Sequence, residues 1–136
     1  MLIKRIARIK LIILDAFLAL TAAAGGVGLL ADLNAPPVES LQGSLFPNYT
    51  IPGLALLVVV GGGALTALIL LLRRHPLGAP ASAAAGVIII GFETVEIWVI
   101  GSPAGIARGL QVFYLSLGML IIILAVGVLW ITQNDQ

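Results

Sequence analysis

Long runs of apolar residues dominate the pattern of hydrophobic and polar positions along this chain. Four runs come close to the roughly 20 residues that an α-helix needs to cross the hydrocarbon core of a bilayer. They cover about residues 9–31, 51–72, 81–101 and 110–131. The pattern therefore predicts an all-α, polytopic membrane protein, in which residues 1–136 form a single domain built as a four-transmembrane-helix bundle.

The prolines support these boundaries, because proline is tolerated in loops and in the first turn of a helix but disrupts a helix interior. Pro52 falls in the first turn of the second run. The other prolines precede a predicted helix or lie in a connection: Pro36, Pro37, Pro47, Pro76, Pro80 and Pro103. The longest connection, residues 34–50, is predicted to be an outer loop.

The basic residues predict how the helices are oriented. Most of them lie at the start of the first run or between the second and third runs: Lys4, Arg5, Arg8, Lys10, Arg73 and Arg74. Only Arg108 lies on the opposite side. Short segments rich in Lys and Arg stay on the cytoplasmic side of a membrane. We therefore expect a multi-pass protein of the cell (plasma) membrane with both termini in the cytoplasm and the 34–50 loop outside.

The first run has a second interpretation. A basic start, an apolar segment and the small residues Ala22, Ala23 and Ala24 also resemble a secretory signal with its cleavage site. However, Asp15 interrupts the apolar segment, and hydrophobicity continues beyond the alanines. We therefore expect this segment to be retained as a membrane anchor.

Composition excludes several classes of function. Hydrophobic residues make up 60% of the chain and charged residues 10%, compared with about 25% charged residues in soluble domains. There is no cysteine, and a single histidine, His75, cannot build a haem or zinc site by itself. The net charge of +1 gives no indication of nucleic-acid binding. No catalytic grouping appears, so we expect no enzyme, no metal site and no resident cofactor, although grooves between the helices could hold a lipid or pigment.

Two carboxylates stand out in the third run. Glu93 falls near its middle and Glu96 one helical turn nearer the outside, so both lie on one helix face. Two acidic residues at full depth cost about 5–7 kcal/mol on insertion, and the surrounding apolar side chains offset about 3–5 kcal/mol. The third helix is therefore expected to be stable only if the carboxylates are protonated, paired or in contact with water.

The fourth run offers partners at the depth of these carboxylates. We predict an intramembrane polar cluster in the outer half of the bundle, made of Glu93, Glu96, Gln111 and Tyr114, with Arg108 at its mouth. An intramembrane carboxylate pair can serve as a proton or cation site, or as a satisfied polar network that sets helix register.

Other residues in the predicted helices have simpler expected roles. Asp15 should lie in the inner leaflet, with Arg8 or Lys10 as its partner. Small residues allow membrane helices to approach one another closely, which is how such helices associate in lipid. Helix packing is therefore assigned to four glycines: Gly26, Gly63, Gly86 and Gly118.

Three segments carry a resemblance to a known group of proteins: SLFPNYTIPGLALLVVVGGG, LLRRHP and LQVFYLSLGMLIIILA. Together they resemble an uncharacterised family of small four-helix bacterial integral membrane proteins, over about residues 45–125. The resemblance implies the four-helix topology and no assigned activity. It also implies that a polar residue is common at the position of Glu96 and less regular at that of Glu93.

Two functional hypotheses follow. The first is an accessory or protein–protein interaction subunit of a larger membrane complex, because the loops are short and no soluble domain is present. The alternative is a small oligomeric proton- or cation-coupled transporter or channel that uses Glu93 and Glu96. We expect membrane lipids as partners, together with other membrane subunits or further copies of the chain, and no nucleic acid.

Overall fold

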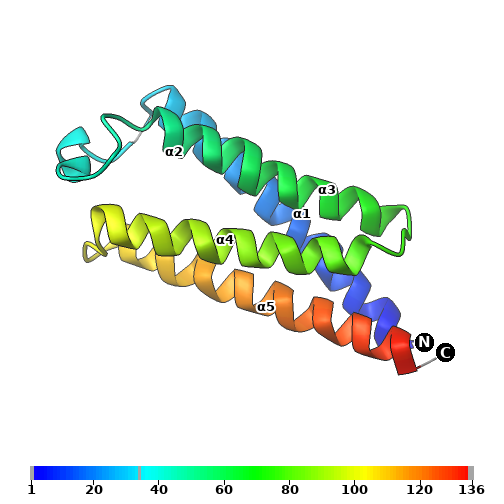
Figure 1. Cartoon of the computed structure of the whole chain (residues 1–136). Helices are drawn as coiled ribbons and strands as arrows, with labels where there is room; N and C mark the ends of the chain where they lie inside the picture. The colour runs from blue at the N-terminus through cyan, green and yellow to red at the C-terminus, as the bar shows by residue number, and fades with distance from the viewer. Residues whose placement is uncertain (1, 34, 135–136) are drawn as a thin grey trace.

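The computed structural model describes residues 2–33 and 35–134. Met1, Asn34 and residues 135–136 lie outside this range, so the first residue of the predicted 34–50 loop and both ends of the predicted 1–136 domain do too. The described part of the chain is helical and contains no strand. It forms four long helical rods joined by short turns and one longer loop (Figure 1).

The first rod is α1 (Leu2–Leu30), and the second consists of α2 (Thr50–Leu54), the π-helical segment η2 (Ala55–Val60) and α3 (Gly61–Leu72). The third and fourth rods are α4 (Gly78–Ile100) and α5 (Ile106–Asn134). A short 3₁₀ helix, η1 (Val38–Leu41), lies in the long loop. All four rods are long and apolar enough to cross a membrane, which confirms the predicted helices.

The rods differ from the prediction in length and in regularity. Helices α1 and α5 each extend over 29 residues, because the basic start of the chain and the polar end of the last apolar run continue the helix. Pro52 and Pro80 lie in the first turns of α2 and α4, where a missing N–H costs no helical hydrogen bond. The π-helical segment η2 is a feature that the sequence did not predict.

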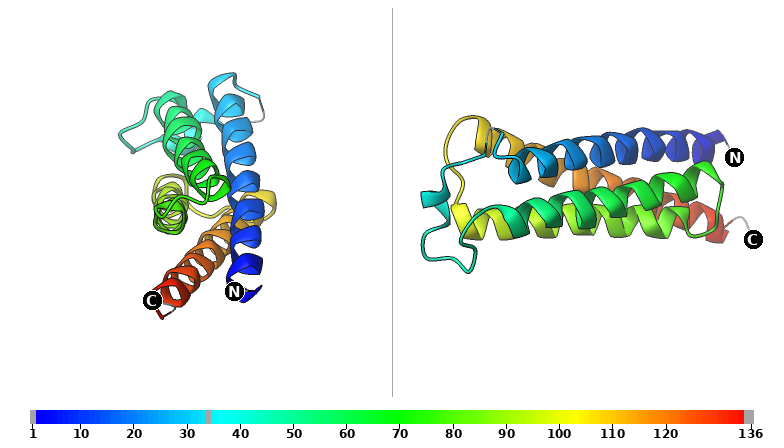
Figure 2. Two further views of the ribbon diagram at one scale, coloured as in Figure 1. Left: turned by 90° about the vertical axis from the view of Figure 1, so that its right-hand side faces the viewer. Right: turned by 90° about the horizontal axis from the view of Figure 1, so that it is seen from above.

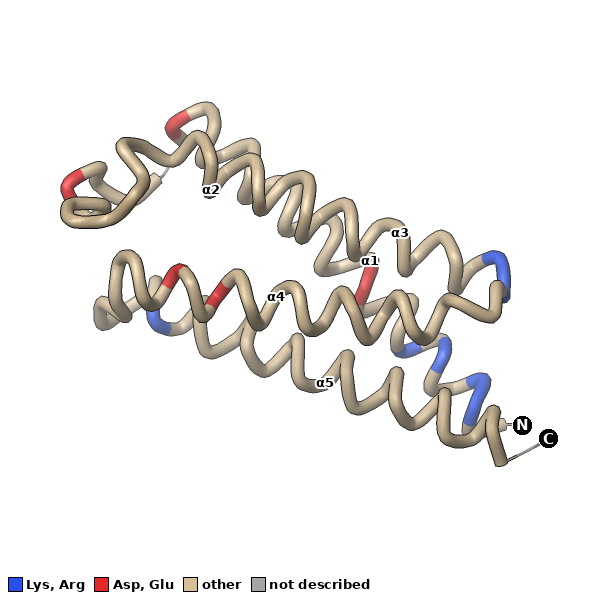
Figure 3. The backbone as a smooth tube through the Cα atoms, viewed as in Figure 1, with Lys and Arg blue, Asp and Glu red and all other residues tan. Residues whose placement is uncertain are grey.

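The two termini lie at one end of the bundle, which we call the termini end, and the long loop lies at the other, the loop end (Figures 1 and 2). Helix α4 packs most extensively against α5, and α1 packs against the second rod. Helix α1 also crosses α5, but it contacts α4 only slightly. Lys and Arg gather at the termini end, with one exception at the loop end (Figure 3).

The core runs between the rods and is closed tightly in the half nearer the termini end. Side chains from all four rods are fully or almost fully buried there: Leu11, Ala64, Leu71, Ala85, Ile121, Ala125 and Val128. Helices that cross a membrane associate by close packing and not by apolar burial alone. The buried core therefore joins the α1–α3 and α4–α5 pairs at this end.

Close packing depends on three of the four predicted glycines. A Cβ at Gly86 would lie 2.8 Å from the carbonyl oxygen of Gly118, and one at Gly118 would lie 2.7 Å from Cγ1 of Ile90. A Cβ at Gly26 would lie 2.7 Å from Cβ of Leu57. Gly63 differs, because a Cβ there would meet its nearest neighbour at an ordinary 3.4 Å.

Candidate functional site

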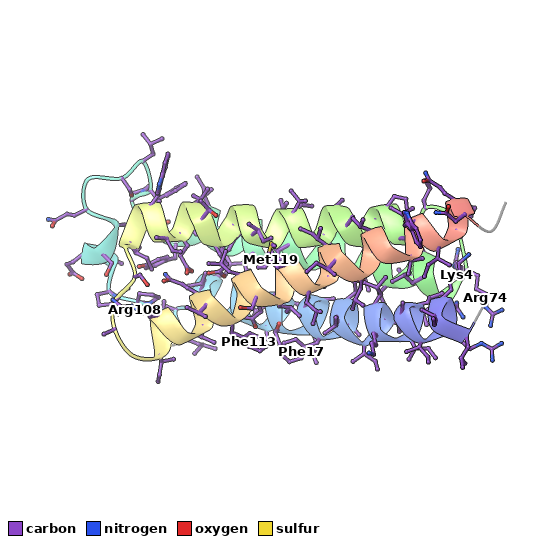
Figure 4. The ribbon with its side chains drawn as sticks, turned by 90° about the horizontal axis from the view of Figure 1, so that it is seen from below. Lys4, Phe17, Arg74, Arg108, Phe113 and Met119 are labelled. Atoms are coloured by element: carbon purple, nitrogen blue, oxygen red, sulfur yellow. The ribbon has the colours of Figure 1, made fainter. Side chains whose placement is uncertain are left out.

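Two cavities open between the helix pairs at the loop end. The larger, about 590 Å³, is lined mainly by α1, α4 and α5. The smaller, about 320 Å³, lies between the second rod, the long loop and α4, and its wall is almost entirely apolar. Toward the middle of the bundle, Phe17 of α1 meets Phe113 of α5 edge to face, with ring centroids 5.8 Å apart (Figure 4). The cavities therefore belong to the half of the bundle in which α1 and α4 are apart.

The irregular segment of the second rod forms part of both walls. Leu56 of η2 lines the larger cavity, while Ala55, Val59 and Val60 line the smaller one. A π-helical turn holds an additional residue and changes the direction in which the following side chains point. Segment η2 therefore allows one rod to present apolar side chains to two cavities.

The long loop closes over the smaller cavity. The Tyr49 hydroxyl donates a hydrogen bond to the carbonyl oxygen of Pro37 at 3.2 Å, and the tyrosine ring lines the cavity. Burial raises the pKa of Tyr49 above its ordinary value, so the phenol remains a hydrogen-bond donor at neutral pH. This bond ties the two ends of the loop together above α2.

Glu93 is the more deeply buried of the two carboxyl groups of the site. Its side chain is 6% exposed and lines the larger cavity. The carboxyl oxygen Oε2 is buried and has no hydrogen-bond partner among the described residues. An unsatisfied buried carboxyl oxygen is costly and needs an explanation, such as a proton, water or ion supplied by the surroundings.

Glu96 lies one turn further toward the loop end and is held by Gln111. The side-chain amide of Gln111 donates to Oε2 of Glu96 at 3.1 Å and to the carbonyl oxygen of Gly101 at 3.0 Å. Gln111 is 2% exposed, so this amide is fixed between the end of α4 and the start of α5. The structure thus brings together Glu96 and Gln111, two of the residues that the sequence singled out.

Glu96 also lies between the two cavities and lines both. Five residues line both of them: Leu29, Pro36, Phe92, Glu96 and Ile100. Glu96 is the only one of these that can ionise, so its carboxyl group is the polar element of an otherwise apolar partition. With Glu93 one helical turn away on the same face, the two carboxyl groups form a continuous acidic strip along α4.

Tyr114 and Arg108 are placed differently from each other. Tyr114 is half-buried and lines the larger cavity with Glu93. Arg108 is exposed, and its guanidinium donates to the carbonyl oxygen of Ser102 through Nη2 at 2.6 Å and Nε at 3.1 Å. Arg108 therefore binds the connection between α4 and α5 and stays exposed, where it avoids the cost of desolvating its charge.

The expected partner of Asp15 was wrong. Asp15 is fully buried and accepts a hydrogen bond from the hydroxyl of Ser82, with Oγ and Oδ2 2.5 Å apart. Arg8 donates instead to the carbonyl oxygen of Leu71 at 3.2 Å. The physical reason is helix rotation, because Asp15 lies on the buried face of α1, toward α4.

The cluster at the loop end offers limited chemistry. Two carboxyl groups and one amide provide fewer oxygen ligands than a divalent cation usually takes, whereas a proton or a monovalent cation needs fewer partners.

The features that sequence reasoning missed are Ser82, a polar residue inside an apolar run, and η2, for which the residues offered no signal. No protein-family model, no curated protein and no solved structure matches this chain.

Proposed function

We propose that this chain is a small proton- or cation-coupled membrane transporter or channel that uses Glu93 and Glu96. The observation that carries the proposal is that Glu93 lines a cavity of about 590 Å³ and has a buried carboxyl oxygen with no hydrogen-bond partner among the described residues. A carboxyl group in this position can take up and release a proton or a cation without breaking a hydrogen bond of the fold.

The roles of the two carboxyl groups differ. Glu93 holds the exchanging proton or cation, because its side chain lines the cavity and one of its carboxyl oxygens has no hydrogen-bond partner among the described residues. Glu96 receives a hydrogen bond from Gln111 and is half-buried, so it modulates the charge beside Glu93. Like-charged carboxyl groups on one helix face oppose each other's ionisation, which favours uptake of one positive charge by the pair.

The cavity extends along only half of the bundle, since Leu11, Ala64 and Ala125 are fully buried in the other half. Passage through a membrane therefore requires either a second conformation or a second copy of the chain. We propose a homo-oligomer, in which further copies complete the pathway.

We further propose that the protein resides in the plasma membrane with both termini in the cytoplasm. This is supported by the gathering of Lys and Arg at the termini end (Figure 3), because cytoplasmic segments are enriched in these residues. Membership of the family of small four-helix bacterial membrane proteins also remains a proposal, supported by the number and length of the helices.

The test is a flux assay on purified protein in sealed lipid vesicles. A membrane potential is applied, and internal pH and cation content are followed with dyes for the wild type and Glu93→Gln. Glu39→Gln is the matched control, because Glu39 is an exposed acid of the long loop. We expect Glu93→Gln to abolish flux, Glu96→Gln to change its rate, and Glu39→Gln to leave it unchanged.

The proposal fails if the wild type carries no flux, or if Glu93→Gln carries as much as the wild type.

The second candidate function is that of an accessory subunit. One specific observation favours it: a face of α4 that includes Val87, Gly91, Val95 and Trp98 is exposed along the helix. Stoichiometric copurification with a different membrane protein, together with absence of flux, would establish that candidate instead.

A further inference from the structure

A third cavity lies at the termini end, far from the carboxyl pair, and its wall is strongly basic. It measures about 630 Å³. Helix α1 contributes Lys4, Arg5 and Arg8, and the turn between α3 and α4 contributes Arg74 and His75. Figure 4 shows Lys4 and Arg74 at this end of the bundle and Arg108 at the other. Segments about 70 positions apart in the sequence thus direct basic groups at one cavity.

Not every basic residue near the termini end lines this cavity. Arg73 is adjacent to Arg74 in the sequence and carries the same charge, yet it does not line the cavity. Basic residues whose only role is to set membrane orientation need not share a cavity, because that effect depends on the side of the membrane and not on contact. Membrane orientation alone therefore does not explain why these basic side chains line one cavity.

Two of the basic groups are held in place by the backbone. Arg8 donates through Nη1 to the carbonyl oxygen of Leu71 at 3.2 Å, which fixes its guanidinium against the last turn of α3. Arg74 occupies a left-handed backbone conformation, with φ of 55°, at a helix end where glycine is the usual residue. An arginine there carries a conformational cost that glycine would avoid.

The backbone adds to the positive character of the cavity. Helix α4 begins at Gly78, and Ala79 of its first turn lines the cavity. The first N–H groups of a helix and the positive end of its dipole favour a bound anion. The N–H of Leu77 donates to Nδ1 of His75 at 3.0 Å, so the other ring nitrogen remains free to donate a hydrogen bond.

No Asp or Glu of the described residues lines this cavity, so its positive charge is not neutralised by the part of the chain that the structure describes. Apart from Thr132, the remainder of the wall is apolar and includes Leu71, Val128 and Leu129. We propose that the cavity at the termini end binds a phosphate group. The source is either the headgroup of an anionic phospholipid or free phosphate.

The proposal is tested by binding measurements on the full chain in a neutral detergent. The probes are phosphatidylglycerol, phosphatidylcholine with the same acyl chains, and inorganic phosphate, each followed by native mass spectrometry and by the melting temperature from tryptophan fluorescence. The test variant is Arg8→Gln/Arg74→Gly. The matched control is Arg73→Gln/Arg108→Gln, which removes the same number of charges from positions outside the cavity.

We expect the wild type to bind phosphatidylglycerol more tightly than phosphatidylcholine, and the test variant to lose at least about tenfold in affinity. The control should bind like the wild type. If inorganic phosphate binds in the same way and competes with the lipid, free phosphate is the source, and if only phosphatidylglycerol binds, a lipid headgroup is. Equal binding of both lipids with no binding of inorganic phosphate, or equal losses in test and control variants, overturns the proposal.

Arg74→Gly alone keeps the experiment decisive if the double variant folds poorly. Glycine adopts the left-handed conformation of position 74 without strain, so this variant should melt at the same or a higher temperature without lipid. It should nevertheless bind phosphatidylglycerol several-fold more weakly than Arg73→Gln does. Unchanged affinity in Arg74→Gly overturns the role assigned to this arginine and, with it, the proposed site.

Discussion

Ser82 of α4 donates a hydrogen bond to Asp15 of α1 across 67 positions of sequence, and both side chains are fully buried. Helices α1 and α4 otherwise contact each other only slightly. This bond therefore links the α1–α3 pair to the α4–α5 pair at the point from which the two pairs separate toward the loop end.

Replacing Ser82 with alanine should destabilise the protein by about 1–2 kcal/mol, because a buried carboxyl group loses its partner. The double variant Asp15→Leu/Ser82→Ala should recover most of this loss, since it removes both polar groups and roughly conserves the volume at position 15. Unfolding in mixed detergent micelles, followed by tryptophan fluorescence, measures both effects. Wild-type stability of Ser82→Ala would show that Asp15 has a different partner.

Gly86→Ala should weaken the contact between α4 and α5. Its Cβ would lie 2.8 Å from the backbone oxygen of Gly118, so the helices must move apart, at a cost of about 1–3 kcal/mol. Gly91→Ala is the matched control, because Gly91 lies on the same helix and a Cβ there meets nothing within 4 Å. The same unfolding assay compares them, and equal stabilities would contradict the close approach of the two helices.

Gln111→Leu should loosen the connection between α4 and α5. The substitution removes the donor to both Glu96 and the carbonyl oxygen of Gly101, so we expect a loss of about 1–3 kcal/mol. Hydrogen exchange should accelerate in residues 101–105, which form this connection. Ser116→Ala serves as control, since Ser116 bonds only within α5. Unaltered exchange in Gln111→Leu would mean that the amide does not order the turn.

The absence of cysteine allows a direct test of orientation with single introduced thiols. Gln42 and Gln133 are both exposed, the first in the long loop and the second near the end of α5. In intact cells, a membrane-impermeant maleimide should label Gln42→Cys and not Gln133→Cys, because the basic termini end is expected to face the cytoplasm. Permeabilised cells should show labelling of both. The reverse pattern would invert the proposed topology.

The sequence by itself determined the four helices and their approximate ends. Apolar length and proline position are properties of single segments, so they can be interpreted without knowing what a helix packs against. The gathering of basic residues at one end also follows from segment order alone. Even the contact between Gln111 and Glu96 could be predicted, because a short turn brings the end of α4 beside the start of α5.

Only the tertiary structure decided which polar groups meet across distant helices and where cavities open. Asp15 pairs with Ser82 and not with Arg8, and Gly86 is a close-contact glycine while Gly63 is not. A helix pattern specifies which residues share a face, but not the tilt, rotation and height at which another helix meets that face. Those depend on the packing of all four rods together, and so do the π-helical segment and the separation of α1 from α4 that places Glu93 beside a cavity.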